Sequence, residues 1–232
     1  MSVYITQCCL SNGLLIYSNA RTPLHSLFID VFEHAEYVQP GIPPIKSGDI
    51  VVDIGANIGM FSLFAASLSP DVQVYALEPA SDTFALLQKN VAANHFTNVQ
   101  CERCAVAAMT GELRLYLDSG SLGDSVIREW VGNENVTGTE RVPCISLDDL
   151  FSRYRLPRCD FLKVDCEGSE FNLFTTASSQ TLEKIAAIAV EYHEHNGRKS
   201  CELVDLLEAH RFQVAEKRTC KEIGMLYARR IA

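Results

Sequence analysis

Short apolar runs rich in β-branched residues alternate with helical patterns along most of the chain from residue 48 onward. Each run has the length of one strand, and a run without polar alternation is typical of a strand buried on both faces. We expect strands at 50–54, 72–77, 99–104, 111–117, 141–145, 160–164, 186–191 and 212–215. The last apolar stretch, 225–228, is expected at an edge of the sheet.

Helical spacing of apolar residues appears between these runs. It is clearest at 58–68 and 81–93. Shorter helices are expected at 171–174, 182–184 and 199–209, and another where Ser146 can cap a helix start. Strands separated by helices predict an α/β fold with a mostly parallel, doubly wound sheet and helices on both faces. In such a sheet ligands bind beyond the carboxyl ends of the strands.

Two segments depart from this alternation. Residues 1–45 predict a small strand-rich N-terminal cap, which divides the chain into a cap at 1–45 and a main domain at 46–232. Residues 118–138 are rich in Gly, Ser and Asn. A long polar insertion in a compact domain is typical of a substrate-facing lid, and we refer to residues 118–138 as the lid segment.

The sequence DIGANIG, residues 53–59, lies where the first buried strand turns into a helix. There Gly55, Ala56 and Asn57 would place backbone amides and a helix N-terminus at the crevice, and Gly59 would permit close packing of helix on strand. A dinucleotide fingerprint has a further glycine where this loop has Asn57. The loop therefore predicts a nucleoside ligand without a diphosphate.

Two acidic residues indicate the chemistry of that ligand. Asp53 precedes the glycines and would repel a diphosphate, but it suits the ammonium and sulfonium groups of S-adenosylmethionine. Glu78, followed by Pro79, ends the second strand, where a carboxylate can accept hydrogen bonds from two ribose hydroxyls. Adenine is expected beside Cys104 and Ala105 at the end of the third strand.

Candidate catalytic residues follow the fourth and fifth strands. Asp165 and Glu167 lie after the fourth strand, where Asp165 would also contact the donor, and Glu191 and His193 end the fifth. A carboxylate beside an imidazole can accept a proton from a hydroxyl. The alternative is a magnesium-like ion held by Asp165, Glu191 and His193, but these residues form no compact ligand motif, and the metal-free base is favoured.

Composition restricts the partners. The formal net charge is −9, with scattered Lys and Arg, so no basic face is present for nucleic acid. No apolar stretch is long enough to cross a bilayer, and the N-terminus lacks a signal-peptide pattern, which together predict a cytoplasmic protein. The nine cysteines are expected to be reduced, because they lack the regular spacing of a disulfide scaffold.

The sequence resembles the FkbM family of S-adenosylmethionine-dependent methyltransferases. The resemblance rests on four motifs: DIGANIG (53–59), LEP (77–79), SLDDL (146–150) and LKVDCEGSE (162–170). It implies a Rossmann-like class I methyltransferase fold with a seven-stranded sheet. It also implies O-methylation of a hydroxyl on a small molecule such as a sugar, a polyketide or another secondary metabolite. Ala107 and Ala108 depart from the Ser-Asp ending expected after the third strand.

Three other functions remain open at this stage. A nicotinamide-dependent oxidoreductase is disfavoured by Asp53 and by the missing loop glycine. Methylation of nitrogen or RNA would call for an Asn/Asp-Pro-Pro-Tyr type of motif, whereas the chain has Asp165-Cys-Glu-Gly. A non-catalytic S-adenosylmethionine-binding module would have no need of the acids and the histidine that end the fourth and fifth strands.

Overall fold

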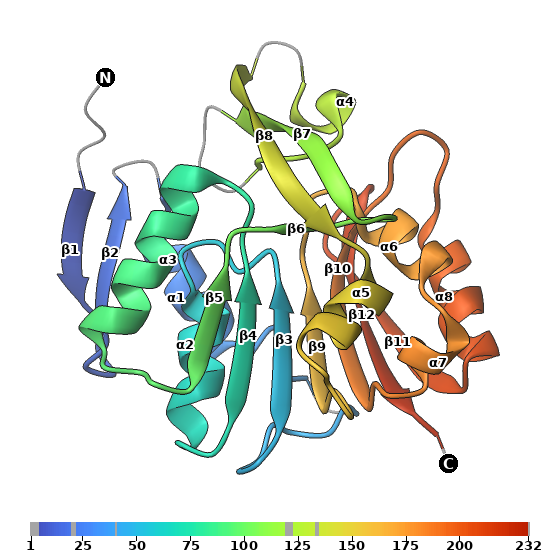
Figure 1. Ribbon diagram of the computed structural model, residues 1–232, viewed down its shortest axis with the longest axis horizontal. Helices are drawn as coiled ribbons and strands as arrows, with labels where there is room; N and C mark the ends of the chain where they lie inside the picture. Colours follow the sequence, from blue (N-terminus) through green and yellow to red (C-terminus); the bar gives the residue numbers. More distant parts are fainter. Residues whose placement is uncertain (1–4, 20–21, 40, 119–122, 133–134, 232) are drawn as a thin grey trace.

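The main sheet contains seven strands in a computed structural model that describes residues 5–19, 22–39, 41–118, 123–132 and 135–231 (Figure 1). In spatial order they are β11 (Phe212–Arg218), β12 (Ile223–Arg230), β10 (Ala187–His193), β9 (Phe161–Val164), β3 (Ile50–Ile54), β4 (Gln73–Leu77) and β5 (Val99–Glu102). The strands from β10 to β5 are parallel, and β12 runs antiparallel to both of its neighbours.

The prediction that residues 225–228 form an edge strand is wrong. They belong to β12, which is inserted between β10 and β11, so that β11 is the edge. The burial pattern accounts for the position: β12 is buried from Gly224 through Ala228, whereas the second half of β11 is exposed. Period and composition reveal that a strand is buried but do not identify its neighbours.

Helices cover both faces of the main sheet, as predicted (Figure 1). Alternate residues of β3 face opposite layers, because successive side chains of a strand point to opposite sides. Val51 packs with α2 (Met60–Leu68) and α3 (Ser81–Ala93). Val52 and Ile54 pack in a second core, whose helices are α5 (Leu147–Arg153), α6 (Glu170–Thr176), α7 (Ser179–Leu182) and α8 (Ser200–Ala209).

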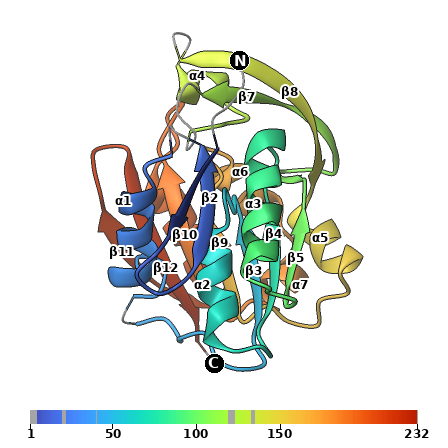
Figure 2. The same ribbon diagram turned by 90° about the vertical axis from the view of Figure 1, so that its left-hand side faces the viewer.

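A second, three-stranded sheet lies across the carboxyl end of the main sheet (Figures 1 and 2). Its order is β6 (Ala105–Val106), β8 (Val136–Ile145) and β7 (Gly111–Asp118). The strands predicted at 111–117 and 141–145 therefore belong to this sheet and not to the main one. Between them lies the lid segment with α4 (Arg128–Val131); its residues 119–122 and 133–134 are outside the described part of the chain.

The N-terminal segment begins with a hairpin of β1 (Ile5–Cys9) and β2 (Leu15–Asn19) and continues with α1 (Leu24–Phe28) and a π-helical turn (Ile29–Glu33). The side chains of Asn90 on α3 and of Asn94, which follows it, bond to the backbone of β2. Apolar side chains of this segment share one core with α2 and α3. The segment is thus fastened to the layer that borders the ligand crevice (Figure 2).

Within the described residues, every helix is too short or too polar to span a bilayer.

Candidate active site

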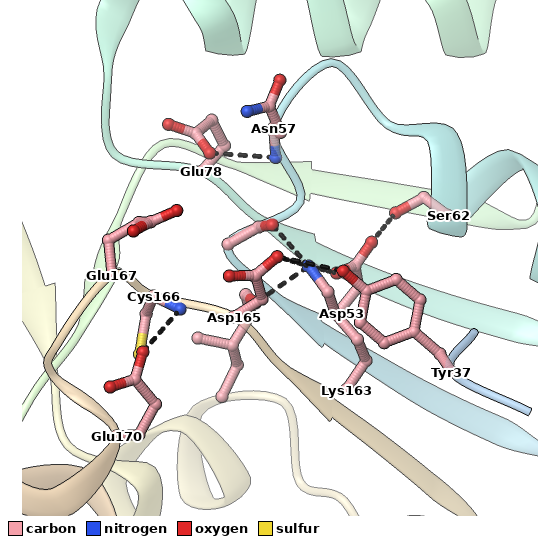
Figure 3. Close-up of polar contacts among 12 residues, drawn as sticks. Tyr37, Asp53, Asn57, Ser62, Glu78, Lys163, Asp165, Cys166, Glu167 and Glu170 are labelled. Carbon is pink, nitrogen blue, oxygen red and sulfur yellow. Dashed lines mark hydrogen bonds and ion pairs between the residues drawn. The ribbon is translucent and has the colours of Figure 1, made fainter. Parts of the chain in front are cut away.

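The candidate site lies where the loops after β3 and β9 meet at the carboxyl ends of these neighbouring strands (Figure 3). The strand that follows β3 along the chain, β4, lies on one side of this pair, and the strand that follows β9, β10, lies on the other side. The point between β3 and β9 is therefore the switch point of the sheet. A Cβ atom at Gly55 would lie 1.7 Å from the carbonyl oxygen of Asp165, and Gly55 has φ +73°. Only glycine permits this approach of the two loops.

The backbone amides of the glycine loop are all used within the chain, contrary to the expectation that they face the crevice. Those of Gly55 and Ala56 donate to the carbonyl of Leu77, at 3.0 and 2.9 Å. The amide of Asn57 donates to Glu78, and the next two donate inside the loop. A loop whose amides are already bonded offers no cradle for a diphosphate.

Glu78 follows β4 and is almost completely buried. Its two oxygens accept hydrogen bonds from the amides of Asn57 (3.0 Å) and Ala80 (2.9 Å), which fix the carboxylate at the edge of a cavity. Burial raises the pKa of Glu78 to about 7, although both backbone bonds favour the charged form. A carboxylate retains further lone pairs, so Glu78 can still accept bonds from a diol.

Asp53 occupies a different place from the one predicted. Its carboxylate is fully buried, accepts a hydrogen bond from Ser62 (2.6 Å) and lies 3.2 Å from the Lys163 ammonium (Figure 3). Lys163 is the residue opposite Asp53 in the register of β3 and β9. Asp53 is not among the residues that line the cavity, so its charge serves Lys163 and not a bound cation.

The cavity extends from this crevice to the small sheet. Its walls include Gly55, Asn57, Glu78, Pro79, Cys104, Ala105, Leu115, Asp124, Val126, Asp165 and Glu167. Four of these residues are acidic, and no lysine or arginine occurs among the described residues that line the cavity. Apolar surface comes from β6 and β7. The cavity therefore suits a ligand with one apolar ring and positive charge.

Asp124 lies in the lid segment and lines this cavity. It was not predicted from the sequence. It accepts a hydrogen bond from the amide of Asp118 at 2.7 Å. Burial raises the pKa of Asp124 to about 6. Asp124 thus supplies an acid to the same cavity as Cys104 and Ala105. It comes from the lid segment and not from Ala107 and Ala108, where the family resemblance led us to expect an acid.

Asp165 connects the crevice to the N-terminal segment. Its Oδ2 atom accepts a hydrogen bond from the Tyr37 hydroxyl (3.0 Å) and lies 3.8 Å from the Lys163 ammonium (Figure 3). Lys163 also donates to the carbonyl of Gly55 at 2.6 Å. Burial and the Asp165 charge raise the pKa of Tyr37 well above its usual value, so the phenol stays a donor.

His193 is buried beside residues 165–169, which we call the catalytic loop, and its ring lies between two carboxylates. Its Nδ1 atom is 3.1 Å from Glu170, and its Nε2 atom is 3.4 Å from Glu167. Burial alone lowers the pKa of the imidazole, but Glu170 and the carboxylates beyond it raise that pKa to about 10. Both carboxylates favour the imidazolium, and His193 is not among the residues that line the cavity, so its role as a proton acceptor stays a prediction.

Glu191 is the other predicted catalytic residue at the end of β10. It is absent from the cavity walls, and burial together with the neighbouring Asp165 charge raises its pKa to about 9. The raised pKa favours the protonated carboxyl, and the role of Glu191 as a base stays a prediction. Of the four predicted catalytic residues, only Asp165 and Glu167 line the cavity.

The set of groups that could hold a metal ion also differs from the one considered for the sequence. Ligand atoms of Asp165, Glu167 and His193 lie within 4.8 Å of one another, whereas Glu191 is not in this group. In the arrangement described here the ring of His193 lies between the carboxylates of Glu167 and Glu170.

Three residues of the site, besides Asp124, have no role in the sequence-based prediction: Tyr37, Ser62 and Glu170. Tyr37 lies far from the motifs, and no local pattern indicates it. Glu170 begins α6, and its contact with His193 depends on the packing of α6 against β10. Lys163 did carry a signal, since a lysine inside an apolar strand needs an acidic partner.

Together, the doubly wound sheet, the buried carboxylate after β4 and the acid-lined cavity define a class I S-adenosylmethionine-dependent methyltransferase. A family model, the methyltransferase FkbM domain, matches residues 53–214, which is most of the chain. The chain belongs to this FkbM methyltransferase family.

Relatives and solved structures agree with this assignment. The chain is 29% identical to 31-O-demethyl-FK506 methyltransferase FkbM of Streptomyces tacrolimicus over the whole of both chains. It is 26% identical to Methyltransferase 1 of Beauveria bassiana, covering 90% of each. Among solved structures, M. jannaschii TYW2 in complex with AdoMet aligns with a TM-score of 0.51 and 14% identity, covering 100% of this chain and 89% of that one, a likeness of fold.

Proposed function

We propose that the protein transfers the methyl group of S-adenosylmethionine to a hydroxyl oxygen of a small organic acceptor. One observation carries the proposal: four carboxylates and no lysine or arginine occur among the described residues that line the cavity, and the loop beside it has no free amide cradle. A sulfonium nucleoside gains from such an environment, and a diphosphate is repelled by it.

The donor is placed by matching its parts to the cavity. The ribose diol lies at Glu78, which is fixed by two backbone amides. Adenine lies on the apolar surface of Cys104 and Ala105, within reach of Asp124. The methionine end lies between Gly55 and Asp165, which directs the sulfonium methyl toward Glu167.

Glu167 is the proposed proton acceptor. The Oδ2 atom of Asp165 already accepts a bond from Tyr37, so Asp165 holds the donor, while Glu167 faces the cavity with His193 behind it. The acceptor oxygen forms a bond to the methyl carbon as the carbon–sulfur bond breaks, and the electron pair of that bond stays on sulfur. The hydroxyl proton goes to Glu167 and then to water.

His193 and Glu191 then act as positioning residues. The imidazolium of His193 fixes Glu167 from behind and is itself held by Glu170. Glu191, as a neutral acid, adds no further negative charge to the cluster. Transfer to a hydroxyl requires a base, and in this proposal a carboxylate in the cavity, with a charged histidine behind it, serves as that base.

Transfer of a tritiated methyl group to hydroxylated small molecules, followed by NMR of the product, tests this function. We expect an O-methyl product, a large loss of kcat in E167Q and little change in donor affinity, because the substitution touches the proton step alone. The exposed Glu112 on β7 provides a matched control, E112Q. Donor binding without any methylated product, or a product methylated on nitrogen, would contradict the proposal.

A further inference from the structure

A second pocket of opposite charge adjoins the donor cavity. It is lined by Arg128 of α4, by Asn172 of α6, and by His195, Asn196 and Arg198 of the loop after β10. The chain as a whole has a formal charge of −9, and the described lining of the donor cavity contains four acids and no lysine or arginine. Two arginines and a histidine around one pocket are therefore a local exception.

The catalytic loop lies between residues of the two pockets. Val126 lines both of them. At Gly168, next to Glu167, a Cβ atom would lie 3.0 Å from Ile127 and 3.5 Å from the His195 ring, and Gly168 has φ +101°. The lid segment is fastened here as well, since the buried Ser125 hydroxyl donates to the carbonyl of Glu167 and accepts from the amide of Ile127.

The two arginines are held differently. Arg198 has its guanidinium 4.9 Å from the centre of the Phe171 ring and its Nε atom 2.8 Å from Glu202, so its position is fixed. Arg128 is exposed and forms no ion pair within the described part of the chain. An exposed guanidinium at a pocket, without an ion pair in the described part of the chain, is suited to bind a carboxylate or a phosphate through two parallel hydrogen bonds.

We propose that this pocket binds an anionic group of the methyl acceptor, so that the acceptor is an acidic hydroxylated compound, carrying a carboxylate or a phosphate. The inference rests on the proposed function and adds the charge of the substrate to it. Arg128 and Arg198 hold the anion, while the hydroxyl of the same molecule reaches past Val126 toward Glu167. The opposite charges of the two pockets then fix which end of the acceptor faces the donor.

Three sugars that share a ring and differ in charge provide the test: glucose, glucuronate and glucose 6-phosphate. Their binding to the enzyme loaded with S-adenosylhomocysteine is measured by calorimetry at low and at moderate salt. We expect both anions to bind about tenfold more tightly than glucose, because two partly exposed charge pairs contribute of that order and are screened by salt. Whichever anion binds more tightly identifies the class of acceptor.

Variants distinguish this proposal from the proposed function. R128Q should remove most of the preference for the anions, and R128K should retain only the part that depends on charge, because a lysine cannot form two parallel hydrogen bonds. Affinity for S-adenosylmethionine should be unchanged in both. R114Q removes an exposed arginine of β7 that does not line the pocket and serves as the control. An unchanged preference in R128Q, or no binding of either anion at tens of millimolar, would overturn the inference. Absence of donor binding in the wild type would instead overturn the proposed function.

Discussion

The charge of His193 gives a prediction for stability as a function of pH. In the folded protein the neighbouring carboxylates raise its pKa from 6.5 to about 10. The folded state therefore binds this proton more tightly than the unfolded chain does. The stability that results is fully present below about pH 6.5 and is lost as pH rises toward 10. Glu191 acts in the same direction, because its pKa is raised from 4.5 to about 9.

The magnitude follows from the number of protons. Each group that is protonated only in the folded state lowers the free energy of unfolding by about 1.4 kcal/mol per pH unit. Between about pH 7 and 8.5 both His193 and Glu191 meet this condition, so we expect a loss of about 4 kcal/mol in the wild type. H193Q removes one of the two protons and should lose about 2 kcal/mol over the same interval.

Urea unfolding followed by fluorescence, at constant ionic strength and with a reductant for the nine cysteines, measures this difference. Both proteins contain the same nine cysteines, so the titration of the thiols cancels in the difference between their slopes. H25Q, at an exposed histidine of α1, is the control and should follow the wild type. Equal slopes for H193Q and the wild type, or stability independent of pH, would refute a buried imidazolium at this position.

Three further substitutions test the site. G55A should destabilise the fold by more than about 3 kcal/mol and abolish donor binding in calorimetry, because the new methyl group meets a backbone oxygen of the neighbouring loop; wild-type stability would contradict the close approach. K163M should lower the free energy of unfolding in urea by about 3–5 kcal/mol, because it leaves Asp53 buried without its lysine partner, and the double variant D53N/K163M should recover most of this loss. A double variant as unstable as the single one would contradict the pairing. Y37F should lower kcat with donor affinity retained, unlike Y227F, whose bond is to the backbone; equal effects of the two would indicate a structural role alone.

Much of the α/β alternation could be read from the sequence, because buried parallel strands are continuous apolar runs. The structure has β3 at 50–54 and α3 at 81–93, the same residues as predicted. Ser146 caps α5 by accepting a bond from the Asp149 amide. What the pattern could not show was pairing. The small sheet and the internal position of β12 depend on contacts between segments that are distant in sequence.

The site was predictable where it follows from a strand end and a local motif, as for Gly55 and Glu78. It was not predictable where the charge state depends on packing. His193 differs from an ordinary histidine because Glu170, on another element, lies 3.1 Å from its ring. Asp53 was predicted to face the positive charge of the donor, and its pairing with Lys163 follows from the register of two strands. Tyr37 reaches Asp165 from the N-terminal segment, outside the residues that the family model matches.

Calorimetry of ligand binding tests the central claim, that an acid-lined cavity without an amide cradle binds a sulfonium nucleoside. S-adenosylmethionine, S-adenosylhomocysteine and NAD are titrated into the wild type, E78Q and the control E112Q. We expect one site for the first two ligands, no binding of NAD, and a loss of about tenfold or more in E78Q from weakened ribose contacts. Binding of NAD in place of S-adenosylmethionine, or equal donor affinity in E78Q and E112Q, would contradict the account.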